Sequence, residues 1–294
     1  MGDIPALPRA QWLWTQKSGS SEQECEDAAY VWQSGEAGVD SAGRAAASLY
    51  ASVSDGASES LLARDWAALL VRDAVESMRL AGDWWQEPGT FVGDLMERSA
   101  LHWDAFLTRY QAERADQGRP IAWYEQPGLE KGAFATVLGT EIRATVLDDG
   151  TTRWFWYSFA LGDSCLFQLR DGRLLDSFPL SAVDEFGITP QLLGSRNHDV
   201  GLVARRMRVA SGELLPGDEL LLATDALAAW LLARAGRTAG GTEGDGGAER
   251  TVDLPAFAAF DRQDFTDWVD DQRARARMRN DDVTLVRARL GAEA

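Results

Sequence analysis

Residues 149–172 read DGTTRWFWYSFALGDSCLFQLRDG and carry the clearest secondary-structure pattern in the chain. An Asp–Gly pair stands at each end of this stretch, and Asp–Gly favours the two-residue turns that join antiparallel strands. Between the two pairs, 153–159 is a dense run of aromatic, β-favouring side chains, and 166–169 is a second apolar run. Outside the pairs, 142–147 and 173–178 have the composition of partner strands. The stretch therefore predicts antiparallel sheet in the middle of the chain.

Amphipathic helices are expected on both sides of this strand-rich centre. Residues 61–80, 91–110 and 225–235 carry apolar side chains three and four positions apart, which is the spacing of one helix face. Strands enclosed by helices predict an α+β fold in which helix layers cover sheet. The many Trp side chains are interpreted as packing between helix and sheet rather than as a ligand cage.

The chain is predicted to form a single domain over 1–294. A Gly-rich stretch at about 236–250 could mark a boundary, but aromatic residues at helical spacing follow it at 257–268. We therefore expect 236–250 to be a loop inside that domain.

The charge and the histidine count exclude several classes of function. With 29 Lys and Arg against 46 Asp and Glu, the net charge is −17, and such a surface repels nucleic acid and anionic lipid. It suits hard divalent cations. His102 and His198 are the two histidines of the sequence, which excludes a three-His zinc site, and neither lies near a nucleophile-elbow sequence. Any catalytic metal must therefore be held by carboxylates.

No targeting or membrane segment is expected. Residues 1–14 lack a basic stretch followed by an apolar core, and the most apolar stretch, 220–235, is interrupted by polar residues and is too short to span a bilayer. Cys25 and Cys165 are too few for a secreted disulfide framework and are expected to be small buried residues. We expect a soluble, cytoplasmic protein.

Acidic residues stand next to strand ends in four short segments, 24–28, 54–60, 220–227 and 279–286. Each segment alone is typical of a helix cap or a turn. Four of them in a chain with two histidines favour a site for Mg²⁺ or Mn²⁺, which prefer oxygen ligands. Gly56 would let a backbone carbonyl approach such an ion.

The acidic segments also occur in a familiar order. They read Glu26-Asp27, Asp55-Gly56, Gly162-Asp163-Ser164, LPGDELLLATD at 215–225, and Asp281-Asp282-Val283-Thr284. This series resembles the bacterial-type members of the type 2C metal-dependent serine/threonine protein phosphatases, and the resemblance spans roughly 16–289. It implies a four-layer α/β/β/α sandwich of two antiparallel sheets flanked by helices, which agrees with the α+β pattern.

The resemblance implies a centre of two Mn²⁺ or Mg²⁺ ions, with a third, weaker ion beside it. The ligands that it implies are Asp27, Asp55, Gly56, Asp163, Asp225 and Asp281. Asp55 would lie between the two ions and Asp163 would bind the third. Asp55 and Glu26 are the implied catalytic residues, with Glu26 holding a water at the metals. A hydroxide formed there would attack phosphorus without an enzyme nucleophile.

The chain departs from the family at three positions. Ala57 stands where some relatives have a His general acid, which leaves that role to a metal-held water or to Glu59. Ala226 replaces the usual Gly after Asp225 and is expected to constrain the backbone. The Arg that often precedes the Glu–Asp pair is missing, and Lys17 is the nearest cation to take over the binding of substrate phosphate.

Asp281 and Asp282 stand side by side at the start of the last predicted strand. Alignment with the family on Val283-Thr284 places the metal ligand at Asp281. Because adjacent residues of a strand point in opposite directions, Asp282 is expected to face a backbone turn or a water on the substrate side.

The expected function is that of a metal-dependent phosphatase acting on phosphoserine and phosphothreonine in proteins, with a cognate Ser/Thr kinase among its partners. Nucleic acid and membranes are not expected partners. Two alternatives remain: a catalytically weak binding or regulatory module with the same fold, and a small-molecule phosphohydrolase.

Overall fold

The computed structural model describes residues 8–34, 47–147, 149–187, 190–237 and 254–291. The loop predicted at about 236–250 lies outside the described residues from position 238 onward. The single-domain organisation of 1–294 stays a prediction.

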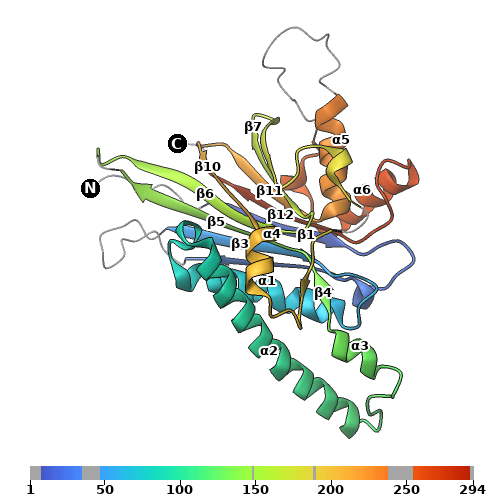
Figure 1. The fold of residues 1–294 in the computed structure, drawn as a ribbon. Helices are drawn as coiled ribbons and strands as arrows, with labels where there is room; N and C mark the ends of the chain where they lie inside the picture. Colours follow the sequence, from blue (N-terminus) through green and yellow to red (C-terminus); the bar gives the residue numbers. More distant parts are fainter. Residues whose placement is uncertain (1–7, 35–46, 148, 188–189, 238–253, 292–294) are drawn as a thin grey trace.

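Two five-stranded antiparallel sheets form the centre of the structure (Figure 1). The first sheet contains, in spatial order, β1 (Arg9–Thr15), β12 (Val283–Arg289), β11 (Glu219–Ala223), β7 (Cys165–Arg170) and β8 (Arg173–Phe178). The second contains β10 (Arg208–Leu214), β6 (Thr152–Leu161), β5 (Val137–Val146), β3 (Ser48–Asp55) and β2 (Asp27–Gln33). A small third sheet pairs β4 (Phe134–Ala135) with β9 (Leu193–Gly194).

Helices cover the outer faces of both sheets, so the predicted four-layer sandwich is confirmed (Figure 1). The second sheet is covered by α1 (Ala63–Ala81) and the long α2 (Pro88–Asp116). The first is covered by α5 (Asp225–Arg237) and α6 (Arg262–Ala274). Two short helices, α3 (Gln126–Lys131) and α4 (Val200–Arg206), complete the described α-helices. The three helices expected from periodicity correspond to α1, α2 and α5.

Apolar side chains fill all three spaces between the layers. Trp156 lies between the two sheets. Trp66 of α1 and Trp103 of α2 pack between these helices and the second sheet, and Phe265 of α6 packs between α6 and the first sheet. All four side chains are almost fully buried. The rings of Trp66 and Trp103 meet edge to face with centroids 5.4 Å apart. The interpretation of these Trp residues as packing residues is therefore confirmed.

Both predicted Asp–Gly hairpins form, but they lie in opposite sheets. The first joins β5 to β6 in the second sheet, and the second joins β7 to β8 in the first. At Asp171 and Gly172 φ is +50° and +73°, the left-handed backbone of a type I′ turn. Between the hairpins the chain changes sheets at 162–164, where Gly162 has φ +119°. This crossover places Asp163 at the junction of the two sheets.

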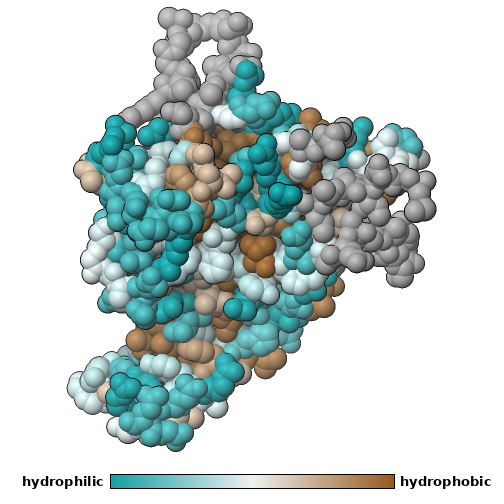
Figure 2. All heavy atoms as spheres, turned by 180° about the vertical axis from the view of Figure 1, so that it is seen from behind, coloured by the Kyte–Doolittle hydropathy of each residue, from teal (hydrophilic) through white to brown (hydrophobic). Residues whose placement is uncertain are grey.

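Among the described helices, none is both long and apolar enough to cross a bilayer. Figure 2 shows the face behind that of Figure 1 as predominantly hydrophilic. Apolar side chains gather there in a band where the projecting end of α2, with α3, joins the rest of the molecule.

Candidate metal centre

Three carboxylates converge where the two sheets meet. Asp55 is the last residue of β3, Asp163 lies in the crossover turn between β6 and β7, and Asp225 is the first residue of α5. One oxygen from each lies within 4.8 Å of the other two. Asp163 and Asp225 are buried, and Asp55 is partly buried. Carboxylate oxygens at this spacing suit a hard divalent cation.

Thr136 connects Asp55 to the crossover turn. Its amide donates to the Asp55 carbonyl at 2.8 Å, and its Oγ1 accepts from the Asp55 amide at 3.0 Å. The same Oγ1 lies 2.9 Å from Ser164 Oγ. A Cβ at Gly162 would come within 2.6 Å of the Thr136 side chain, so the turn can approach this closely only with glycine. Thr136 thus sets the position of Asp55 relative to Asp163.

Gly56 lies in a space that admits no side chain. A Cβ at this position would come within 2.9 Å of the carbonyl oxygens of both Ala63 and Glu26. The Gly56 amide donates to that Glu26 carbonyl at 3.2 Å. The end of β3, the residue before β2 and the start of α1 therefore meet around Gly56, directly beside Asp55.

Asp27 stands opposite Asp55 across the β2–β3 ladder. Its Oδ2 accepts a 2.8 Å hydrogen bond from the Thr224 hydroxyl. Its Oδ1 is buried and has no hydrogen-bond partner among the described residues, and the same holds for Oδ1 of Asp163. Buried acceptors without a donor are costly, and a cation would satisfy both of them.

The electrostatics of the cluster also favour a cation. Burial, together with repulsion from Asp281 and Asp163, raises the pKa of Asp55 to about 8, against the opposing effect of Arg279. Burial and then repulsion from Asp55 raise the pKa of Asp27 well above its ordinary value. Burial is also the main cause of the raised pKa of Asp163. Positive charge placed among these groups would relieve both desolvation and repulsion.

Asp281 and Asp282 make different contacts, and the direction of Asp281 toward the metal ions stays a prediction. Asp282 is buried, and its two oxygens accept from the backbone amides of Lys17 and Glu26, both at 2.8 Å. Asp281 is partly exposed, and its Oδ1 accepts from the Asp282 amide at 3.0 Å. The Asp281 carboxylate is not one of the three that converge, although it acts electrostatically on Asp55.

Glu26 and Lys17 lie together beside the cluster. Glu26 Oε2 accepts a hydrogen bond from the Ser58 hydroxyl and lies 3.6 Å from Lys17 Nζ. Partial burial lowers the pKa of Lys17, but the carboxylates of Glu26, Asp282 and Asp281 outweigh this effect and raise it. Lys17 therefore stays cationic at a position where it can meet an anion approaching the carboxylates.

Arg279 is a residue of the site that the sequence analysis missed. Its guanidinium contacts Asp225, and its Nε lies 3.5 Å from Asp281 Oδ2. The loop that carries Arg279 is held by Arg273, which donates to the carbonyl oxygens of Asp281 and Gln16. The sequence offered one signal for this role, a cation two residues before Asp281. The direction of the Arg279 side chain, however, depends on the contact that Arg273 makes with the loop.

The two alanine departures have different consequences. Ala226 is buried in the first turn of α5 and lies outside the positive-φ residues, so the backbone there holds alanine without strain. An ordinary helical conformation accepts alanine well. Ala57 donates its amide to the Phe134 carbonyl at 2.8 Å and offers no acid group. The exposed Glu59 is not part of the converging carboxylates.

The fold is similar to that of solved bacterial serine/threonine phosphatases. The serine/threonine phosphatase of Staphylococcus aureus matches with a TM-score of 0.52 at 13% identity, over 100% of this chain and 98% of that one. The S. agalactiae serine/threonine phosphatase matches with a TM-score of 0.52 at 14% identity, over 96% and 100%. A variant of a bacterial serine phosphatase gives a TM-score of 0.53 at 13% identity, over 98% and 99%.

No protein-family model and no curated protein matches the sequence. The structural similarity therefore establishes the fold class, that of the serine/threonine phosphatases, over nearly the whole chain. This confirms the fold implied by the resemblance of the acidic motifs.

Proposed function

We propose that this protein is a Mn²⁺- or Mg²⁺-dependent phosphoprotein phosphatase that hydrolyses phosphoserine and phosphothreonine. The observation that carries the proposal is the convergence of Asp55, Asp163 and Asp225 within 4.8 Å at the junction of the two sheets. The orphaned oxygens of Asp27 and Asp163 support it, because both need positive charge. The phosphatase fold supports the choice of reaction.

The proposed ion-binding residues are those that the resemblance implies. Two ions would be held by Asp27, Asp55, Gly56, Asp225 and Asp281, and a third, weaker ion would be held by Asp163. Bound divalent cations supply hydroxide near neutral pH and neutralise phosphoryl oxygens. Because the two His residues lie outside this cluster, the centre would use oxygen ligands alone, namely carboxylates and the Gly56 carbonyl.

The remaining side chains handle the proton and the phosphoryl group. Glu26 Oε2, oriented by the Ser58 hydroxyl, accepts a proton from the attacking water. Lys17 and Arg279 flank the carboxylates and bind the phosphoryl oxygens, in place of the Arg that many relatives have before the Glu–Asp pair. A guanidinium fork and an ammonium both suit phosphate.

The proposed substrates are phosphorylated proteins of the cytoplasm, including those of a signalling pathway with a cognate Ser/Thr kinase. The net charge of −17 supports the exclusion of nucleic acid and anionic membranes as partners. The second candidate function is a catalytically weak binding or regulatory module, and the observation in its favour is Ala57, which offers no general acid.

Hydrolysis of p-nitrophenyl phosphate and of a phosphothreonine peptide, with Mn²⁺, with Mg²⁺ and with chelator, tests the proposal. We expect metal-dependent turnover of both substrates, lost in Asp55→Asn while the fold survives, because an amide cannot neutralise two cations. Metal binding without turnover would favour the binding module. Turnover of small phosphate esters alone would favour a small-molecule phosphohydrolase, and absence of metal binding would contradict the centre.

A further inference from the structure

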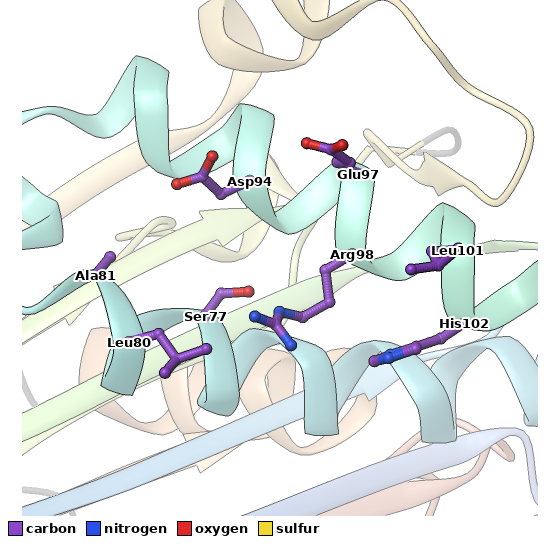
Figure 3. Close-up of a pocket in the computed structure, with 8 residues that line it drawn as sticks. All are labelled: Ser77, Leu80, Ala81, Asp94, Glu97, Arg98, Leu101 and His102. Carbon is purple, nitrogen blue, oxygen red and sulfur yellow. The ribbon is translucent and has the colours of Figure 1, made fainter.

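A cavity of about 410 Å³ lies between α1 and α2, on the outer helix layer (Figure 3). Its polar lining comes from Ser77 on α1 and from Asp94, Glu97, Arg98 and His102 on α2. None of these side chains belongs to the carboxylate centre. The cavity falls within the size range of small-molecule sites.

Two hydrogen-bond donors of this cavity are without partners. Ser77 is 3% exposed, and its hydroxyl has no hydrogen-bond partner among the described residues. Arg98 is partly buried, and within the described part of the chain no ion pair or hydrogen bond involves its guanidinium. Figure 3 shows the Ser77 hydroxyl and the Arg98 guanidinium directed into the same gap, while the Glu97 carboxylate points away from it. The charge of Arg98 acts on the buried Asp73, and a buried hydroxyl beside a guanidinium that makes no hydrogen bond suits an anionic acceptor.

His102 supplies a third polar group, held in place by a buried carboxylate. Its Nδ1 lies 2.7 Å from Oδ1 of Asp73, which is 4% exposed. Because a carboxylate accepts, Nδ1 carries the proton, and Nε2 is left for another partner. His102 also lines a second cavity of about 300 Å³, together with Tyr30 and Asp73 among others.

We propose that the α1–α2 cavity binds a small organic anion, whose carboxylate or phosphate group is held by Arg98 and Ser77 beside His102. The guanidinium fork matches two anionic oxygens, and the hydroxyl supplies a further donor. Leu80, Ala81 and Leu101 at the rim give apolar contact to a short carbon skeleton. Asp94 and Glu97 repel highly charged polyanions, so the ligand is a compact anion with one or two charges.

The two-histidine composition gives a site-specific test on the full chain. The imidazole signals of His102 and His198 are followed by NMR in Mg²⁺ buffer during titration with succinate and, separately, with inorganic phosphate. We expect the His102 signals to move saturably while those of His198, which lines neither cavity, do not. The probe that binds more tightly identifies the anion as a carboxylate or a phosphate.

Matched variants locate the binding. Arg98→Gln is expected to weaken it by about tenfold or more, since a charge-assisted contact is lost. Arg109→Gln, the same change at an exposed position of the same helix, should leave it unaltered. Ser77→Ala should also weaken binding, whereas a hydroxyl that is merely buried would leave affinity unchanged and raise the melting temperature.

Two results would overturn the proposal. One is that neither succinate nor inorganic phosphate moves the His102 signals. The other is that Arg98→Gln binds the probe as the unaltered chain does, since the anion would then be held elsewhere, for example at Lys17 and Arg279. Both outcomes are independent of whether the carboxylate centre hydrolyses phosphate esters.

Discussion

The Thr224 hydroxyl donates a 2.8 Å hydrogen bond to Oδ2 of Asp27, and this contact joins the two sheets at the carboxylate cluster. Thr224 follows β11 of the first sheet, whereas Asp27 begins β2 of the second. The same hydroxyl oxygen accepts from the Thr284 amide at 2.9 Å. One oxygen of Asp27 is therefore committed to Thr224, whereas the other has no hydrogen-bond partner among the described residues.

Thr224→Val should destabilise the protein. The substitution keeps the shape but leaves Asp27 Oδ2 without its donor and the Thr284 amide without its acceptor, so we expect a loss of about 1–3 kcal/mol in the free energy of unfolding. Thr224→Ser keeps the hydroxyl and is the matched control. Urea unfolding in chelator measures both, and unchanged stability of the Val variant would contradict the role given to this contact.

Without divalent cations, stability should fall as the pH rises. The pKa of Asp55 is raised to about 8 in the folded state and is about 3.9 in the unfolded chain. Its contribution to the free energy of unfolding is therefore fully present below pH about 3.9 and is lost as the pH rises through about 8. Asp27 and Asp163 act in the same direction. Asp55→Asn removes one titrating group, so its stability relative to the unaltered chain should improve between pH 5 and 8, with a slope of at most about 1.4 kcal/mol per pH unit.

Urea unfolding across this pH range, in chelator, gives that difference. A difference that does not change with pH would show that Asp55 is ionised throughout. Added Mn²⁺ should flatten the pH dependence of the unaltered chain, because bound cations favour the ionised carboxylates.

Asp281→Asn should lower mainly the turnover, whereas Asp282→Asn should lower mainly the stability of the fold. Asp281→Asn removes a charge that acts on Asp55, and we expect turnover of p-nitrophenyl phosphate to fall at least about a hundredfold with little change in stability. Both carboxylate oxygens of Asp282 accept hydrogen bonds from backbone amides. An Asn at this position must turn its NH₂ group toward the amide of either Lys17 or Glu26, where two donors then face each other. The expected cost is about 1–3 kcal/mol of stability.

Activity and thermal melting of the two variants decide between these outcomes. Equal loss of turnover, or a larger loss for Asp282→Asn in a fully folded protein, would reverse the assignment of the two carboxylates.

Lys17→Gln and Arg279→Gln should each weaken the binding of phosphate. Each removes a cation at the edge of the carboxylates, so KM for p-nitrophenyl phosphate should rise about tenfold or more, with a smaller change in kcat. Arg279→Gln also removes the contact to Asp225, so the Mn²⁺ concentration for half-maximal activity should fall. Arg275→Gln, an exposed charge paired with Asp271, is the control. Unchanged KM in both site variants would exclude them from phosphate binding.

Gly56→Ala should disturb the site through the backbone. Its Cβ would lie 2.9 Å from two carbonyl oxygens, so the end of β3 must shift, at a cost of about 1–3 kcal/mol. Gly89→Ala, in the exposed first turn of α2 with open space around it, should leave stability unchanged or slightly higher. Thermal melting with and without Mn²⁺ compares them, and a Gly56→Ala protein with normal stability and metal response would contradict the packing argument.

Local patterns in the sequence were sufficient for the hairpins and the long helices. The Asp171–Gly172 turn needs positive φ at both residues. Asp–Gly favours this backbone whichever sheet the two strands join. The order of the acidic motifs was likewise sufficient for the four-layer fold and for the approach of Asp55, Asp163 and Asp225, although the ligand role of each stays a prediction.

Tertiary structure alone decided which sheet each hairpin joins and which charges surround the carboxylates. The crossover at Gly162 depends on its contact with Thr136, which lies far from it in the sequence. The direction of the Arg279 side chain depends on a loop that is anchored by Arg273, and the sequence does not indicate this contact. Turn and strand preferences act over a few neighbouring residues, whereas these contacts form between segments that meet only when both sheets have packed. For the same reason the sequence showed Ser77, Arg98 and His102 as ordinary helix residues, and only the packing of α1 against α2 brought them to one cavity.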